Sequence, residues 1–131
     1  MCALHYLRFA TSRPARYARG ATLGLFEPAY AYRDREQTPE WLRAALAEEI
    51  EWFEWNLRVP RQFGVVTRRS RRPYAGVCWF RSDAREAIRH ADAISALLDE
   101  CGVPLSRIVT ETPGDIVWRD DQQVVAIPRL H

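Results

Sequence analysis

The chain contains no lysine, because all 19 of its basic residues are arginine. It also contains a single asparagine, Asn56. Replacement of lysine and asparagine by arginine and alanine is typical of proteins from high-GC genomes. The absence of lysine therefore describes the genome, whereas the places where arginines cluster describe the protein.

Long hydrophobic runs are also absent. No stretch approaches the roughly 18 consecutive apolar residues that indicate a membrane-spanning helix. The first ten residues carry His5 and Arg8 within their apolar stretch and have no basic region before it, which is not the pattern of a signal peptide. We therefore expect a cytoplasmic protein with no membrane partner.

Cysteine is scarce, and the three cysteines, Cys2, Cys78 and Cys101, are widely spaced with no Cys-x-x-Cys pair. This pattern excludes a disulfide framework and the usual structural zinc motifs. We expect no metal and no cofactor. With 131 residues, 47% of them hydrophobic, we expect one domain spanning residues 1–131.

Charge is unevenly distributed along the chain. Residues 58–89 hold nine arginines against Asp83 and Glu86, a net charge of +7, whereas residues 33–57 and 90–131 are each net −4. The total of +2 therefore hides a strongly basic middle between two acidic segments. Such asymmetry indicates a contact steered by electrostatic attraction.

Local patterns predict the elements of the first half. Residues 3–10 and 21–26 are expected to be strands, and residues 27–35 a short helix. A stronger helix is expected over 39–57, with Thr38 as its N-cap and Pro39 in its first turn. Its apolar stripe comprises Leu42, Leu46, Ile50, Phe53 and Leu57.

The second half follows a strand–helix–strand pattern. A strand is expected over 75–80 and a helix over 83–101, capped by Asp83 and ended by Gly102. Further strands are expected at 105–112, 116–118 and 123–127, with a Pro113-Gly114 turn before the second of these. We predict an α+β domain with a mixed sheet of four or five strands and the two main helices packed on one face.

Several short motifs resemble those of a group of uncharacterised small bacterial and phage proteins. They are Gly24-Leu25-Phe26-Glu27, Trp52-Phe53 with Asn56-Leu57, Val59-Pro60, Cys78-Trp79-Phe80, Thr112-Pro113-Gly114 and Gln123-Val124-Val125-Ala126. The resemblance covers most of the chain from residue 20 onward. It implies a bacterial or phage origin and an intact fold, and it assigns no site residues.

The strongest functional signal is an arginine run inside an expected exposed loop at about 61–74. Guanidinium groups donate rigid pairs of hydrogen bonds to phosphate or carboxylate and stay charged at any working pH. We predict an anion or nucleic-acid site formed by Arg68, Arg69, Arg71 and Arg72, joined by Arg81, Arg85 and Arg89. The alternative is a solvated loop whose arginines pair with acidic residues of helix 39–57.

A second candidate lies on the other side of helix 39–57. Trp41, Trp52 and Trp55 form a stripe interleaved with Glu48 and Glu51, which suits a protein-binding or dimer surface. The alternative, which we favour for so small a protein, is that these tryptophans cover the sheet or the preceding helix. The neighbouring glutamates could also imitate a phosphate backbone, although a solvated helix face is the simpler interpretation.

Catalysis is the weakest interpretation. An enzyme using Cys78 and His90 would need an exposed thiol with a lowered pKa, and the apolar neighbours of Cys78 argue against that. We therefore predict a non-catalytic binding protein, monomeric or homodimeric, whose partner is nucleic acid or a nucleoprotein complex. The alternative is a protein-interaction module or inhibitor from a phage or mobile element.

Overall fold

The computed structural model describes residues 4–14, 22–60, 64–65 and 74–129. Three α-helices occur in this part of the chain: α1 (Phe26–Asp34), α2 (Glu40–Asn56) and α3 (Arg85–Glu100). The strands are β1 (Tyr6–Pro14), β2 (Thr22–Gly24), β3 (Gly64–Val65), β4 (Tyr74–Ala75), β5 (Val77–Arg81), β6 (Ser106–Thr110), β7 (Asp115–Arg119) and β8 (Gln123–Ile127). The α+β class and the order of elements predicted from the sequence are confirmed.

The main sheet has six strands, in the order β2-β1-β5-β8-β7 with β6 also paired to β1. Every recorded pairing among the described strands is antiparallel, so the prediction of a mixed sheet is wrong. The reason lies in β1. It is hydrogen-bonded to β5 and to β6, and so it separates the two strands that α3 connects.

β5 and β6 still run parallel to each other, as a strand–helix–strand unit requires, because both are antiparallel to β1. The unit is therefore split by an inserted strand. In the sequence, β1 lies far from both strands, and nothing in the local pattern of residues 75–112 indicates this insertion.

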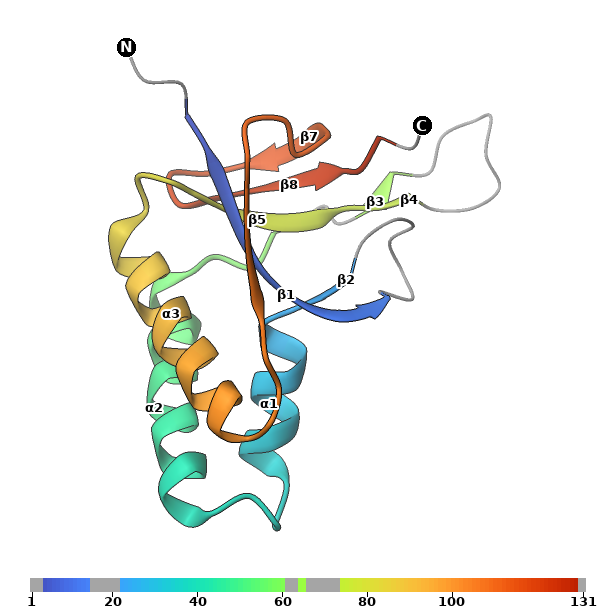
Figure 1. Cartoon of the computed structure of the whole chain (residues 1–131). Helices are drawn as coiled ribbons and strands as arrows, with labels where there is room; N and C mark the ends of the chain where they lie inside the picture. The colour runs from blue at the N-terminus through green and yellow to red at the C-terminus, as the bar shows by residue number, and fades with distance from the viewer. Residues whose placement is uncertain (1–3, 15–21, 61–63, 66–73, 130–131) are drawn as a thin grey trace.

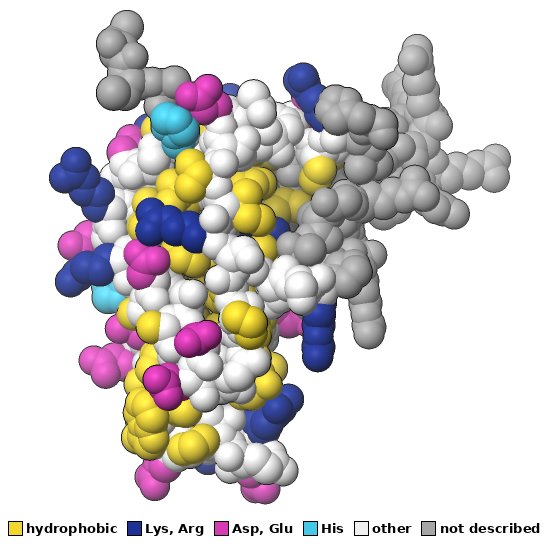
Figure 2. All heavy atoms as spheres, in the orientation of Figure 1, with side chains coloured by type: hydrophobic (Ala, Val, Ile, Leu, Met, Phe, Trp, Pro, Cys, Tyr) yellow, Lys and Arg dark blue, Asp and Glu magenta, His cyan; other side chains and the backbone are white. Residues whose placement is uncertain are grey.

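The helices gather on one side of the sheet, as Figure 1 shows, and the space-filling view of the same face shows acidic side chains spread over the part that the helices form (Figure 2). The core lies between the two layers, where Leu7, Phe9 and Phe80 from the sheet meet the apolar stripes of the helices. Leu42, Leu46, Ile50 and Phe53 of α2 are all buried, as their spacing predicts, and so are Ala87, Ile88, Ala91, Ile94 and Leu98 of α3. Short connections keep α1 against α2, and α2 packs on α3.

The predicted helix caps are partly wrong. The Thr38 side chain is buried, and its Oγ1 has no hydrogen-bond partner among the described residues; Pro39 occupies the cap position of α2 instead. The Asp83 carboxylate accepts hydrogen bonds from Arg81 rather than capping α3, which begins after Ala84. Gly102 ends α3 as predicted, with a left-handed φ of 81° and a hydrogen bond from its amide to the Asp99 carbonyl.

Among the described residues, no helix combines the length and apolar character needed to cross a membrane.

Candidate functional site

The arginine run Arg68–Arg72 lies outside the described residues, but the strands on either side of it are described. β3 and β4 pair with each other in antiparallel register, with Gly64 opposite Ala75 and Val65 opposite Tyr74. Val65 and Tyr74, which precede and follow residues 66–73 in the sequence, therefore lie opposite each other. The four arginines of the run all fall within this connection.

Arg81, at the end of β5, is occupied by contacts within the protein. Its Nε and Nη2 donate to the two carboxylate oxygens of Asp83 at 3.1 and 2.9 Å, and its Nη1 donates to the Asp120 carbonyl at 3.4 Å. The hydrogen bonds from Arg81 lower the pKa of Asp83 below its ordinary value. Arg81 thus joins the turn before α3 to the turn between β7 and β8.

Arg85 and Arg89 project from the first two turns of α3. Arg89 donates to the Glu86 carboxylate at 2.7 Å. Arg85 is exposed and makes no hydrogen bond or ion pair with the residues that the structure describes. Of the three arginines expected to support the loop, Arg85 is the one whose guanidinium faces solvent without a carboxylate beside it.

The tryptophans of α2 divide into two kinds. Trp41 and Trp55 are 61% and 81% exposed, and Glu48 between them is also exposed. Trp52 is half-buried and stacks on the His90 ring of α3, with ring centroids 4.1 Å apart. The favoured expectation that all three cover the sheet or α1 is therefore wrong for Trp41 and Trp55.

His90 of α3 lies between carboxylates of α2 and α3 and so links the two helices. Its Nδ1 is 2.5 Å from the Glu49 carboxylate, and its Nε2 is 3.9 Å from that of Glu86. Cys78 lies in β5, and burial raises the pKa of its thiol to about 12. A thiol with so high a pKa is a poor nucleophile near neutral pH, and no recorded contact links it to His90.

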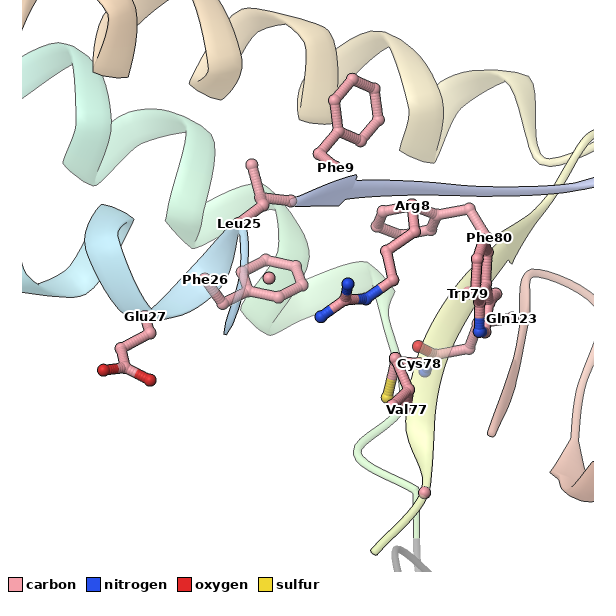
Figure 3. Close-up of a pocket in the computed structure, with 12 residues that line it drawn as sticks. Arg8, Phe9, Leu25, Phe26, Glu27, Val77, Cys78, Trp79, Phe80 and Gln123 are labelled. Carbon is pink, nitrogen blue, oxygen red and sulfur yellow. The ribbon is translucent and has the colours of Figure 1, made fainter. Parts of the chain in front are cut away.

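A pocket that sequence reasoning missed opens beside β1. It has a volume of about 200 Å³ and contains Arg8, whose side chain extends into the space between β5 and the start of α1 (Figure 3). Only 7% of Arg8 is exposed. The signal available in the sequence was a charged residue at the centre of the apolar run Tyr6–Ala10.

In the described part of the chain, no group of three or more His, Cys, Asp or Glu side chains is arranged to hold a metal ion. Comparison of the chain with models of protein families, with curated proteins and with solved structures finds no match.

Proposed function

We propose that the protein is a small, non-catalytic, cytoplasmic binding protein that docks on nucleic acid or a nucleoprotein complex. Docking takes place through the connection 66–73. The observation that carries the proposal is the pairing of β3 with β4, because it places opposite each other the two residues, Val65 and Tyr74, between which the sequence holds Arg68, Arg69, Arg71 and Arg72. Four guanidiniums confined to one short connection form a concentrated site for phosphate oxygens.

The distribution of charge supports this choice of partner. The segment 58–89 has a net charge of +7, and it is flanked by segments of net −4. Acidic flanks repel a polyanion and so restrict productive encounters to the basic segment. Arg85 adds an exposed charge, whereas Arg81 and Arg89 are held by Asp83 and Glu86 and contribute less.

The test compares two variants with the same change in net charge. In the first, Arg68, Arg69, Arg71 and Arg72 are replaced by serine. In the second, four exposed arginines outside the basic segment are replaced by serine: Arg35, Arg107, Arg119 and Arg129. Binding of labelled single-stranded RNA, single-stranded DNA and duplex DNA is measured by fluorescence anisotropy at about 50 and 200 mM salt.

If each loop arginine neutralises one phosphate, log K should fall with log salt with a slope of about −3 to −4. The loop variant should lose this slope and most of its affinity, whereas the control variant should retain the slope. Equal affinity of the loop variant and the wild type at low salt, or equal losses in both variants, would contradict the proposal.

A second candidate function is favoured by the exposure of Trp41 and Trp55. Large aromatic side chains dominate protein-binding hot spots, and the exposed Glu48 and Glu51 between the two tryptophans suit a protein with a basic surface. In this alternative the chain is an interaction module or inhibitor from a phage or mobile element. Acrylamide should quench tryptophan fluorescence in the free protein, and a partner bound to α2 should protect it; a partner that leaves quenching unchanged does not bind this face.

A further inference from the structure

β6 (Ser106–Thr110) forms an edge of the main sheet. It pairs with β1 in an unbroken antiparallel register, from Ser106 opposite Ala10 to Thr110 opposite Tyr6. In Figure 1, β6 (orange) crosses in front of the other strands. Among the strands that the structure describes, none pairs with the other edge of β6. That edge therefore presents backbone donors and acceptors with no strand beside them.

The hydrogen bonds of His5 decide which residues of β6 present these groups. The His5 amide donates to the Ser82 hydroxyl and its carbonyl accepts from the Ser82 amide, so both groups point toward β5. Successive residues of a strand point their backbone groups to opposite edges, and so Tyr6 is bonded to β6, opposite Thr110. The amide and carbonyl of Val109, the preceding residue of β6, therefore point away from β1 toward the open edge.

β6 also lacks the features that commonly keep an edge strand from pairing, such as bulges, prolines or several charges. β7, at the other end of the sheet, has a register shift between Ile116 and Trp118. β6 is regular, contains no proline, and has Ile108 and Val109 exposed by 37% and 54%. A regular and partly apolar edge of this kind is a surface for another strand.

The side chains along the open edge carry charge in a definite order. Arg107 lies over the Phe9 ring of β1 at 5.9 Å, and Glu111, directly after β6, lies 3.1 Å from His5 at the start of β1. Val109 lies between Arg107 and Glu111 and shares their face by alternation. A strand that meets this face of the edge therefore encounters a positive, an apolar and a negative side chain in turn.

This order is complementary to itself when it is read in the opposite direction. In an antiparallel pair of two β6 strands, residues whose backbone groups point outward lie opposite one another. With Val109 opposite Val109 of a second copy, Arg107 of each copy lies opposite Glu111 of the other, so two pairs of opposite charge form. A register centred on Arg107 or on Glu111 places like charges opposite each other, and the intermediate registers place Val109 opposite a charge.

The contacts that Arg107 and Glu111 make within the chain do not prevent this arrangement. Arg107 is 3.6 Å from Asp92 and Glu111 is 3.1 Å from His5, and all four side chains are between 43% and 59% exposed. Ion pairs this exposed contribute little to stability, so each charge can turn toward a second copy at small cost.

We propose that the protein forms a symmetric homodimer in which β6 of one copy pairs antiparallel with β6 of a second copy. The twofold axis passes between the two Val109 residues, and the two sheets become one continuous sheet. One strand edge is a small interface beside the roughly 1,200–2,000 Å² of stable complexes, so the Kd should be about 10–100 µM. The proposal depends neither on docking through 66–73 nor on the exposed tryptophans of α2.

The first test is sedimentation velocity of the full chain from about 5 to 500 µM, over which a monomer should be replaced by a dimer. Val109→Arg places two guanidiniums against each other on the axis and should raise the Kd by about tenfold or more. Val59→Arg is the matched control, because Val59 is also an exposed valine, at 82%, and lies after α2 rather than in β6. It should dimerise as the wild type does.

The second test exchanges the charges. Arg107→Glu and Glu111→Arg each place like charges opposite each other and should each weaken the dimer, whereas the combined variant restores opposite charges and should dimerise more tightly than either single variant. Circular dichroism checks that each variant is folded. Hydrogen exchange locates the contact: the Val109 amide should exchange more slowly as the protein concentration rises, and the Ile108 amide, which points toward β1, should not change.

Three results would overturn the proposal. The first is a monomer at every concentration up to about 500 µM, which would leave this edge to a different partner. The second is a dimer that Val109→Arg does not weaken, because such a dimer uses another surface. The third is a combined charge variant that dimerises no better than the single variants, and this result decides the question if Val109→Arg does not fold.

Discussion

Gly114 and Gly102 differ in what surrounds them, although both have a positive φ. At Gly114 φ is 128°, and a Cβ would lie 2.2 Å from the Ile127 carbonyl oxygen. At Gly102 φ is 81°, and a Cβ would meet nothing within 4 Å. The first glycine is required by backbone contact between β7 and β8, and the second only by its conformation.

Gly114→Ala should therefore destabilise the protein by about 3 kcal/mol or more, because the β7–β8 pair must separate to admit the methyl group. Gly102→Ala should lose only about 1–2 kcal/mol, the cost of a left-handed alanine. Urea unfolding followed by circular dichroism measures both values. A smaller loss at Gly114 than at Gly102 would contradict the geometry.

Sequence reasoning succeeded at single residues where the constraint is local. Glycine was expected after the 83–101 helix and in the Pro113 turn because few other residues tolerate such backbone angles, and both glycines have a positive φ. It missed the pocket beside Arg8, because that depends on where β5 and α1 lie. No pattern within residues 3–10 contains that information.

At the scale of elements, helix positions were predictable and their N-terminal caps were not. The apolar stripes of α2 and α3 depend only on spacing along the chain, and their residues are buried as expected. The Asp83 cap failed because Arg81 competes for the same carboxylate with two hydrogen bonds. The preference for aspartate at a helix N-cap does not take account of an arginine two positions earlier that binds the same carboxylate.

The contact between α2 and α3 supplies the test at this scale. His90→Ala removes the ring that stacks on Trp52 and the hydrogen-bond partner of the half-buried Glu49, and should cost about 1–3 kcal/mol. Arg89→Ala, one position earlier on α3, removes an exposed ion pair and should cost no more than about 1 kcal/mol.

Chemical denaturation of the two variants at pH 7 separates these expectations. Equal stability of His90→Ala and Arg89→Ala would show that the stacked histidine does not hold the helices together. The stability of His90→Ala also bears on function. It tests whether Trp52 is engaged by α3, whereas Trp41 and Trp55 are exposed.

For the whole molecule, the class was predictable and the strand order was not. Alternating strands and helices indicate an α+β domain, but the insertion of β1 between β5 and β6 is a long-range pairing. That insertion makes the sheet antiparallel, and the division of β1 between β5 and β2 opens the pocket. The pocket was therefore beyond sequence reasoning for the same physical reason as the topology.

Burial of the Cys78 thiol should also make the free energy of unfolding depend on pH under alkaline conditions. Cys78 has an ordinary thiol pKa near 9 when unfolded, and burial raises it to about 12 in the folded protein. Between these values the unfolded chain has lost the thiol proton and the folded chain has kept it. The free energy of unfolding should therefore fall as pH rises from about 9 to 12, by at most about 1.4 kcal/mol per pH unit.

Cys78→Ala should remove this part of the slope. Cys101→Ala is the comparison variant at the other described cysteine, whose thiol pKa is raised by desolvation and by the neighbouring Glu100. Urea unfolding at pH 8, 9 and 10 measures the slopes of both variants and the wild type. Identical slopes in wild type and Cys78→Ala, together with rapid alkylation of Cys78 at pH 7, would show a low-pKa thiol and would restore the case for a catalytic cysteine.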